Sequence, residues 1–274
     1  MTFTTSDDNI YRQEIEQIKK ACYSIKILYR YMDVTGCILS LENSNLLFNH
    51  PATFNDPFDC HNNIVDFSNP TDQYYTYIVN KHFPHYNDDE KQQKIQEFKN
   101  KGIHLSGQEM LKLHRICCFT SAFNNLLMWA HYTEKHQGCC LAFDLKNLLG
   151  SISQKYSSVG LYPIDYKTEF PTINYYEQPL RALTSWQILK SKDWAYEKEI
   201  RAIIVDRFTN TDPLLIPINA KSFKAIYLGC KIDPEKKKKI IDICSQKYPH
   251  MKIYQMTLAE NKFELHPVLV EINK

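Results

Sequence analysis

The order of the expected elements predicts an α+β fold, a single domain over residues 1–274 with a mostly antiparallel β-sheet at its core. Strand-like segments come in runs and helical segments are grouped elsewhere, whereas a parallel βαβ array would alternate the two regularly. Hydrophobic residues make up 43% of the chain and charged residues 23%, which is ordinary globular composition rather than disorder. A chain of 274 residues is also long enough to bury a substantial core.

The individual elements follow from the spacing of the apolar residues. Apolar residues at helical spacing predict a leading helix within residues 1–25, and further helices are expected at 126–129, 181–190 and 235–247. Residues 71–113 are polar and helical in pattern, with too few apolar side chains for a core of their own, so we expect a helical insertion. Short apolar runs predict strands at 26–31, 116–119, 138–143, 196–205, 214–218, 223–228, 253–256 and 263–270.

Charge and cysteine usage narrow the class of protein. The net charge of +2 gives no overall field that would favour nucleic acid or a membrane. The nine cysteines are odd in number and form no C-x-x-C motif. The sequence also shows no signal peptide and no apolar run near the roughly 18 residues that span a bilayer. These features predict a cytoplasmic protein with reduced thiols and no membrane contact.

Two carboxylates open the strand expected at 196–205. Alternate side chains of a strand share a face, so Glu197 and Glu199 should point the same way. Two like charges on one face are unfavourable unless something uses them, so the pattern predicts a paired-carboxylate site. The alternative is a strand entrance whose acids pair with Lys192, Lys198 or Arg201.

Two other strand ends carry polar groups suited to a site. Arg30 ends the first expected strand between two tyrosines, where it would pair with a buried carboxylate or hold an anionic ligand. Thr120 and Ser121 offer hydroxyls where a strand meets a helix. A helix N-cap would explain one of these two residues.

Residues 128–138 concentrate several rings in one short segment, which includes Trp129 and Tyr132. His131 and His136 are not at the i, i+4 spacing that places two ligands on one helix face, so no metal is expected. The alternative is a helix that packs its rings and ends at Gly138. A catalytic cysteine and histidine pair stays open elsewhere, at Cys60-His61 or at Cys118.

These motifs, taken in order, resemble the bacterial family known as domain of unknown function 2971. The resemblance extends from about Leu28 to Leu228, and the family name implies no settled activity. The segments that carry it are Tyr29-Arg30-Tyr31, 54–59, 118–121, 128–132, 136–138, 142–144 and 194–201.

A second resemblance supplies chemistry. Mono-ADP-ribosyltransferases of the arginine–serine–glutamate type have an arginine ending an early strand, a Ser-Thr-Ser-like strand end and a Glu-x-Glu before an apolar strand. Similar motifs occur here in that order, at Tyr29-Arg30, Phe119-Thr120-Ser121 and Glu197-Lys198-Glu199. The chain departs from the pattern because no glycine follows Arg30 and Phe119 stands in place of the first serine. The resemblance implies a twisted, split β-sheet with flanking helices.

The same resemblance implies NAD as substrate, an unknown protein or nucleic-acid acceptor, and a toxin or defence effector. Cleavage of the nicotinamide–ribose bond develops an oxocarbenium-like cation, which a fixed carboxylate, here Glu199, would stabilise. Glu197 would orient or activate the acceptor as a general base. Arg30 would hold the anionic dinucleotide, Ser121 would orient the carboxylate or the ribose, and further NAD contacts are expected from Tyr29, Thr120, Trp129, His131 and Tyr132.

Two other functions stay open from the sequence. The first is a non-catalytic module that binds protein or nucleic acid through surface rings and the run Lys236–Lys239. That run is also typical of a solvated helix face. The second is a hydrolase or nuclease of another kind, with polar site groups at Asp56, Asp59, His131 and Glu199.

Overall fold

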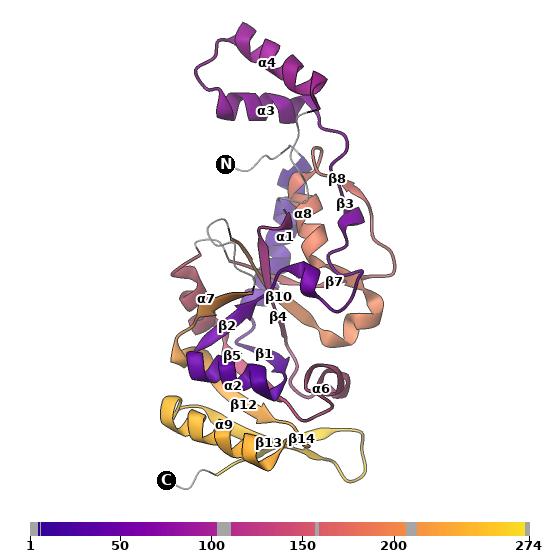
Figure 1. Ribbon diagram of the computed structural model, residues 1–274. Helices are drawn as coiled ribbons and strands as arrows, with labels where there is room; N and C mark the ends of the chain where they lie inside the picture. The colour runs from indigo at the N-terminus through magenta and orange to yellow at the C-terminus, as the bar shows by residue number, and fades with distance from the viewer. Residues whose placement is uncertain (1–4, 6, 103–110, 157–158, 207–212, 272–274) are drawn as a thin grey trace.

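The computed structural model describes residue 5 and residues 7–102, 111–156, 159–206 and 213–271 (Figure 1). Its centre is an eight-stranded sheet in the order β14-β13-β12-β5-β1-β4-β10-β6. Neighbouring strands are antiparallel except β12 and β13, which are parallel, so the predicted α+β class with a mostly antiparallel sheet is confirmed. The strands are β1 (Ile27–Met32), β4 (His114–Thr120), β5 (Cys139–Asp144), β6 (Gly160–Pro163), β10 (Glu199–Val205), β12 (Phe223–Leu228), β13 (Lys252–Leu258) and β14 (Leu265–Leu269).

Short strand pairs and helices surround this sheet. The strand pairs are β2 (Asn45–Phe48) with β11 (Leu214–Pro217), β3 (Val65–Asp66) with β8 (Ile173–Asn174), and β7 (Asp165–Lys167) with β9 (Leu189–Ser191). The α-helices are α1 (Asp7–Tyr23), α2 (Val34–Asn43), α3 (Asp72–His82), α4 (Asp88–Asn100), α6 (Leu126–Tyr132), α7 (Leu145–Ser153), α8 (Pro179–Ile188) and α9 (Pro234–Lys247). Short 3-10 segments are η1 (Pro51–Thr53), η2 (Asn62–Ile64), η3 (Lys192–Glu197) and η4 (Ala220–Ser222).

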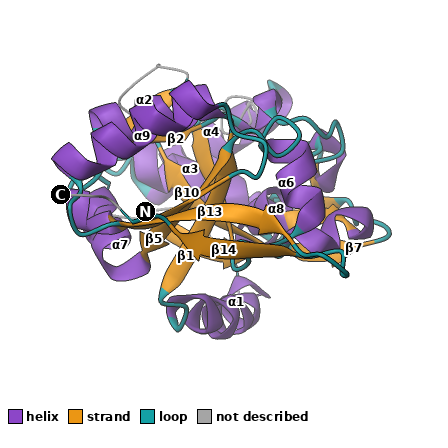
Figure 2. Ribbon diagram, turned by 90° about the horizontal axis from the view of Figure 1, so that it is seen from below, coloured by secondary structure: helices purple, strands orange, loops and turns teal. Residues whose placement is uncertain are grey.

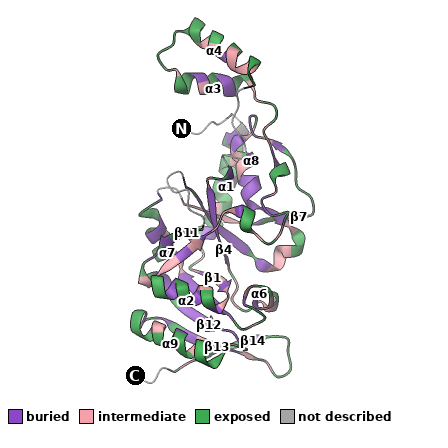
Figure 3. Cartoon of the chain, viewed as in Figure 1, coloured by how far each residue is buried: buried purple, intermediate pink, exposed green. Residues whose placement is uncertain are grey.

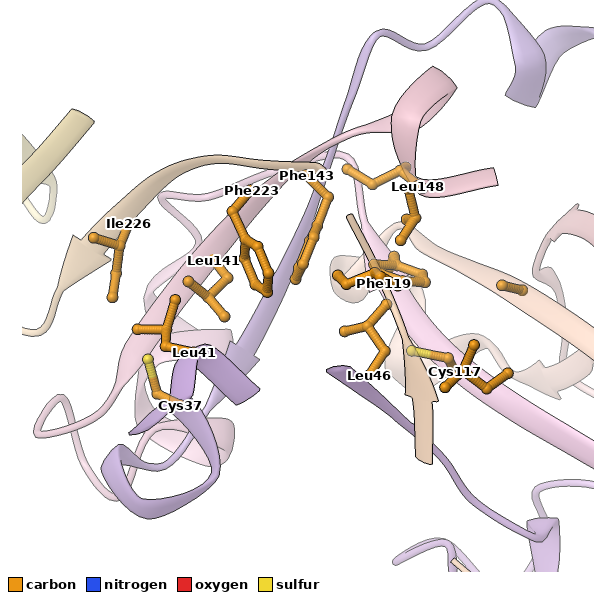
Figure 4. Packing of buried hydrophobic residues seen from close by; sticks show 14 of the residues in the cluster. Cys37, Leu41, Leu46, Cys117, Phe119, Leu141, Phe143, Leu148, Phe223 and Ile226 are labelled. Carbon is orange, nitrogen blue, oxygen red and sulfur yellow. The ribbon is translucent and has the colours of Figure 1, made fainter. Parts of the chain in front are cut away.

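Helices cover the sheet from two sides. Figure 2 shows α2 and α9 on one side of the strand layer and α1 on the other. On the side of α2 and α9 the strands bury a continuous apolar core, because alternate strand residues there are hydrophobic. Figure 4 shows Phe143 between Phe119 and Phe223, at ring-centroid distances of 5.7 and 5.3 Å. None of the described helices is long and apolar enough to cross a membrane.

The sheet is divided between β1 and β4. These neighbours share one register pair, Tyr29 with Thr120, whereas β10 pairs with β4 along its whole length. The short pairing lets the two strands diverge beyond that point. A cavity lined by residues of both strands opens there.

The helical insertion expected at 71–113 contains the helix pair α3 and α4, and residues 103–110 of that range lie outside the described residues. Asn87 begins α4 with a capping box, in which the Glu90 side chain accepts from the Asn87 backbone. Tyr74 of α3 packs its ring 4.5 Å from that of Tyr176, which attaches the pair to the rest of the fold. Figure 3 shows that α4 is otherwise largely exposed.

Two predicted boundaries near the site are wrong. The strand expected from Tyr196 begins only at Glu199, because η3 continues through Glu197 and Lys198 takes a left-handed φ of 46°. The helix expected over 181–190 ends at Ile188, and Lys190 belongs to β9. Glu197 and Glu199 therefore do not share a strand, and their convergence has another cause.

Candidate functional site

A cavity of about 400 Å³ opens where β1, β4 and β10 meet. It brings together most of the side chains that the sequence singled out. Those that line it are Tyr29, Arg30, Thr120, His131, Tyr132, Glu197 and Glu199. Asn55, Asp59, Cys118 and Lys190 also line it, and of these only Asp59 and Cys118 were named from the sequence, for other chemistries.

The register of the sheet explains this convergence. Tyr29 of β1 pairs with Thr120 of β4, and Thr120 pairs on its other side with Glu199 of β10. Directly paired residues of antiparallel strands project to the same face, so these three side chains form a row across the sheet. Three motifs far apart in the chain thus meet at one position.

Glu199 is a buried carboxylate held by two cations. Arg201 donates from Nε to Oε1 at 2.7 Å and from Nη2 to Oε2 at 3.2 Å. Lys190 Nζ lies 3.0 Å from Oε2. Burial alone would raise the pKa of Glu199, but the charges of Arg201 and Lys190 outweigh it and lower that pKa to about 2. Glu199 therefore carries a fixed negative charge at neutral pH.

Glu197 is held differently. Lys190 donates to its Oε2 at 2.6 Å, and the Tyr132 hydroxyl donates to its Oε1 at 2.5 Å. Burial raises the pKa of Glu197 above its ordinary value, although Lys190 and Tyr132 favour the ionised form. The two carboxylates thus meet through a shared lysine and not through a common strand face.

Asp59 and Arg201 complete what we call the charge cluster, defined as Asp59, Lys190, Glu197, Glu199 and Arg201. Arg201 Nη2 donates to Asp59 Oδ2 at 2.6 Å, and Nη1 donates to the backbone carbonyl of Gln187 at 2.7 Å. All five residues are less than 9% exposed. The alternative in which an acid pairs with Arg201 is therefore observed. The sequence does not predict the contribution of Lys190, because the helix expected over 181–190 includes it.

Arg30 follows Tyr29 in β1, so its side chain projects to the opposite face of the strand and reaches the cavity from that side. Its Nη1 donates to the backbone carbonyl of Leu47 at 3.0 Å and also contacts Cys117 Sγ. Within the described residues no carboxylate forms an ion pair with Arg30. A half-buried guanidinium without a carboxylate partner is suited to an anionic ligand.

Thr120, rather than Ser121, supplies the hydroxyl at the cavity. Thr120 Oγ1 donates to the backbone carbonyl of Glu197 at 2.6 Å and accepts from Ala122 N at 3.1 Å, so it fixes the segment before β10. Ser121 is exposed and does not line the cavity. The difference arises because β4 ends at Thr120, and the next side chain leaves the row.

The rings of α6 divide between packing and the cavity. Asn125 caps this helix by accepting from Leu127 N and Met128 N. Trp129 is fully buried, donates its indole N–H to Phe123 O at 2.9 Å and does not line the cavity. His131 does line it, and its ring lies 6.3 Å from Tyr196 and 6.5 Å from Trp194, measured between centroids.

The cysteines near the cavity are not activated. Burial raises the pKa of both Cys60 and Cys118, whereas a thiol nucleophile needs a lowered pKa. The Cys118 thiol is near Glu199 and helps to lower the pKa of that carboxyl. All nine cysteines are free, and all except Cys118 and Cys230 are buried. No group of three or more His, Cys, Asp or Glu side chains within the described ranges is arranged to hold a metal ion.

The basic run Lys236–Lys239 lies in the first turns of α9. None of its residues lines the cavity, and Lys239 pairs with Glu42 of α2 at 3.0 Å. The run thus belongs to a helix surface separate from the charge cluster.

Comparison with known proteins gives one match. Residues 128–202 match a family described as protein of unknown function (DUF2971). No curated protein and no solved structure matches the chain. The matched segment excludes β1 and β4 but includes Tyr132, Lys190, Glu197, Glu199 and Arg201.

Proposed function

We propose that this protein cleaves the nicotinamide–ribose bond of NAD and transfers ADP-ribose to water or to a protein or nucleic-acid acceptor. The observation that carries the proposal is the meeting of the three predicted motifs at one cavity. Arg30, Thr120 and Glu199 come from adjacent strands and line the same 400 Å³ space. If the motifs matched only by chance, their residues would have no reason to lie at one cavity.

The charge of Glu199 suits the reaction. Bond cleavage leaves positive charge on the ribose ring, and a preorganised carboxylate in a water-poor site stabilises that charge. Arg201 and Lys190 keep Glu199 ionised and fix its orientation. Among the described residues, Arg201 Nε donates to its Oε1. A carboxylate has about four lone-pair sites, so Oε1 can also accept from a ribose hydroxyl.

The remaining groups fit the rest of the dinucleotide. Arg30 would bind the pyrophosphate, because a guanidinium matches phosphate oxygens in a bidentate manner. His131 and Tyr132 line one wall and would contact the nicotinamide ring. Thr120 takes the positioning role first assigned to Ser121, since its hydroxyl holds the Glu197 backbone.

Nicotinamide release from NAD, measured by liquid chromatography, tests the proposal. We expect release by the wild-type protein, and a loss on the order of 100-fold in Glu199→Gln, the scale of removing one group that stabilises a transition state. Arg30→Met should raise KM. The matched control is Glu97→Gln on α4, because Glu97 is also a carboxylate held by two cations but does not line the cavity.

Folding is followed for each variant by circular dichroism. Wild-type protein that releases no nicotinamide from NAD would contradict the proposal. A folded Glu199→Gln variant with undiminished release would contradict the role of Glu199.

A further inference from the structure

Lys190 occupies the centre of the charge cluster. Its side chain is 5% exposed, and Nζ lies 2.6 Å from Glu197 Oε2, 3.0 Å from Glu199 Oε2 and 3.7 Å from Asp59 Oδ2. An ammonium group has three N–H donors, and here three carboxylates surround it. A single side chain of β9 therefore connects both site glutamates.

The three carboxylates depend on Lys190 unequally. Arg201 pairs with Glu199 and with Asp59, so each of these keeps a cation if Lys190 is removed. Glu197 has Lys190 as its only cation among the described residues. Its other partner, Tyr132, donates a neutral hydrogen bond.

Counting charges shows what the loss of Lys190 would do. Three carboxylates and two cations give the cluster a formal charge of −1. Without Lys190 the charge would be −2 in a buried site, which is unfavourable unless one carboxylate takes up a proton. Glu197 is the group that would take it, because burial already raises its pKa while that of Glu199 is lowered.

We infer that Lys190 is a positioning residue for Glu197, which it holds ionised and available to accept a proton, while Arg201 keeps Glu199 as a fixed charge. The inference rests on the proposed NAD cleavage. The two carboxylates thus differ in the cation that holds them. Glu197, held by Lys190, serves the acceptor, and Glu199, held by Arg201, serves the ribose.

This arrangement serves the transfer of ADP-ribose from NAD to the acceptor. The bond between ribose C1′ and the nicotinamide nitrogen breaks, and its electron pair leaves with nicotinamide. A lone pair of the acceptor, a water oxygen in hydrolysis, forms the new bond to C1′. The proton of the acceptor moves to the Glu197 carboxylate and then to solvent.

Glu197 has several ionisable neighbours, and three of them are tyrosines. Burial raises the pKa of the tyrosines, so they stay neutral through the neutral range. Lys190 is therefore the neighbour whose charge decides the ionisation of Glu197. The groups that face Glu197 are Lys190 of β9, Glu199 of β10, Tyr132 of α6, Tyr166 of β7 and Tyr196 of η3. Asp59 and Arg201 pair with Lys190 and Glu199.

The test is a pH titration of the Glu197 carboxyl carbon by ¹³C NMR, with the resonance assigned from its absence in Glu197→Gln. In Lys190→Met we expect the midpoint to rise by about 1–3 pH units, the effect of removing an adjacent opposite charge. Lys190→Arg should restore a midpoint near that of the wild type. The matched control is Lys192→Met, since Lys192 is exposed and forms no described ion pair.

The second readout is the pH profile of NAD hydrolysis. Its rising limb should move upward in Lys190→Met by the same amount as the NMR midpoint and return in Lys190→Arg. Lys190→Gln, which keeps a hydrogen-bond donor but no charge, replaces Lys190→Met if that variant does not fold.

An unchanged Glu197 midpoint in a folded, uncharged variant overturns the inference, whatever the activity. A shift at Glu199 in place of Glu197 overturns it too. Failure of the wild type to release nicotinamide would instead overturn the proposed function, and the NMR titration would still show which carboxylate Lys190 controls.

Discussion

Two glutamates of this chain have the same lowered pKa, about 2, in opposite surroundings. Glu97 lies on the surface of α4 with its side chain 38% exposed, between Lys94 at 2.7 Å and Lys101 at 2.8 Å. Glu199 is buried in the charge cluster, held by Arg201 and Lys190. Lys94 and Lys101 lower the pKa of Glu97 against little desolvation, whereas Arg201 and Lys190 must overcome the cost of burying Glu199.

The comparison shows why similar pKa values carry different information. Exposed ion pairs are screened by water and contribute little to stability, so the pairs of Glu97 need no functional explanation. A buried network is costly to assemble, and well-packed apolar residues are often as stable or more stable. The opposite face of β10 has that apolar packing, with Ile200, Ala202 and Ile204. We therefore attribute the charges on the cavity face to function.

The largest effect is expected from Arg201→Met. This change leaves Asp59 and Glu199 with Lys190 alone, and removing one partner of a buried ion pair costs about 3–5 kcal/mol. Urea unfolding at pH 7 measures the loss. Lys101→Met, which removes a partner of Glu97, is the matched control and should leave the unfolding midpoint nearly unchanged. Equal losses in both variants would contradict the comparison.

The pH dependence of stability should show the next largest effect. The folded-state pKa of Glu199 is about 2 against an ordinary value of 4.5, so its contribution is present above about pH 4.5 and is lost as the pH falls toward 2. The difference between the two pKa values of Glu199 corresponds to about 3 kcal/mol of folding stability. Glu197 has the opposite sign, because its raised folded-state pKa favours the folded protein at low pH.

Urea unfolding of the wild type and of Glu199→Gln between pH 6 and pH 2 separates this contribution. The wild type should lose more stability than the variant over the window from about pH 4.5 to about 2. Parallel curves would show that the ionisation of Glu199 is not linked to folding.

A smaller effect is expected from Cys118→Ala. The thiol of Cys118 helps to lower the pKa of Glu199, and the loss of one such polar interaction costs about 1 kcal/mol. Cys118→Ser keeps a donor and should lie closer to the wild type. If both variants unfold at the same urea concentration as the wild type, the Cys118 thiol contributes nothing to the stability of the cluster.

The smallest effect is expected from Glu97→Gln. Water screens the ion pairs that this change removes, so they contribute little to stability. Thermal unfolding should therefore occur at a temperature close to that of the wild type. A clear loss of stability would mean that the exposed pairs are not weakly coupled, and the contrast with Glu199 would fail.

Much of the fold was accessible from the sequence because burial leaves a periodic pattern. Apolar runs located β1, β4, β5 and β12, and helical spacing located α1 and α9. The helix α2 was missed, since its first residues Val34, Thr35 and Gly36 are poor helix formers. It forms because Asp33 caps it and Val34, Cys37 and Leu41 are buried against the core.

The site was accessible only in part, because its geometry depends on tertiary contacts. The register that aligns Tyr29, Thr120 and Glu199 cannot be read from any one segment. The positive φ of Lys198 leaves no periodic signal, and Lys190 reaches the cavity from a different strand. The available signal is a lysine a few residues before two glutamates, but the apolar spacing of 181–190 favours a helix there.

The most direct test of the account is a crystal structure with a non-hydrolysable NAD analogue. We expect the analogue in the cavity between β1 and β10, its pyrophosphate on Arg30 and a hydroxyl of its nicotinamide ribose within about 3 Å of Glu199 Oε1. An empty cavity at saturating analogue, or an analogue bound on another surface, would contradict the claim that this is a site for NAD.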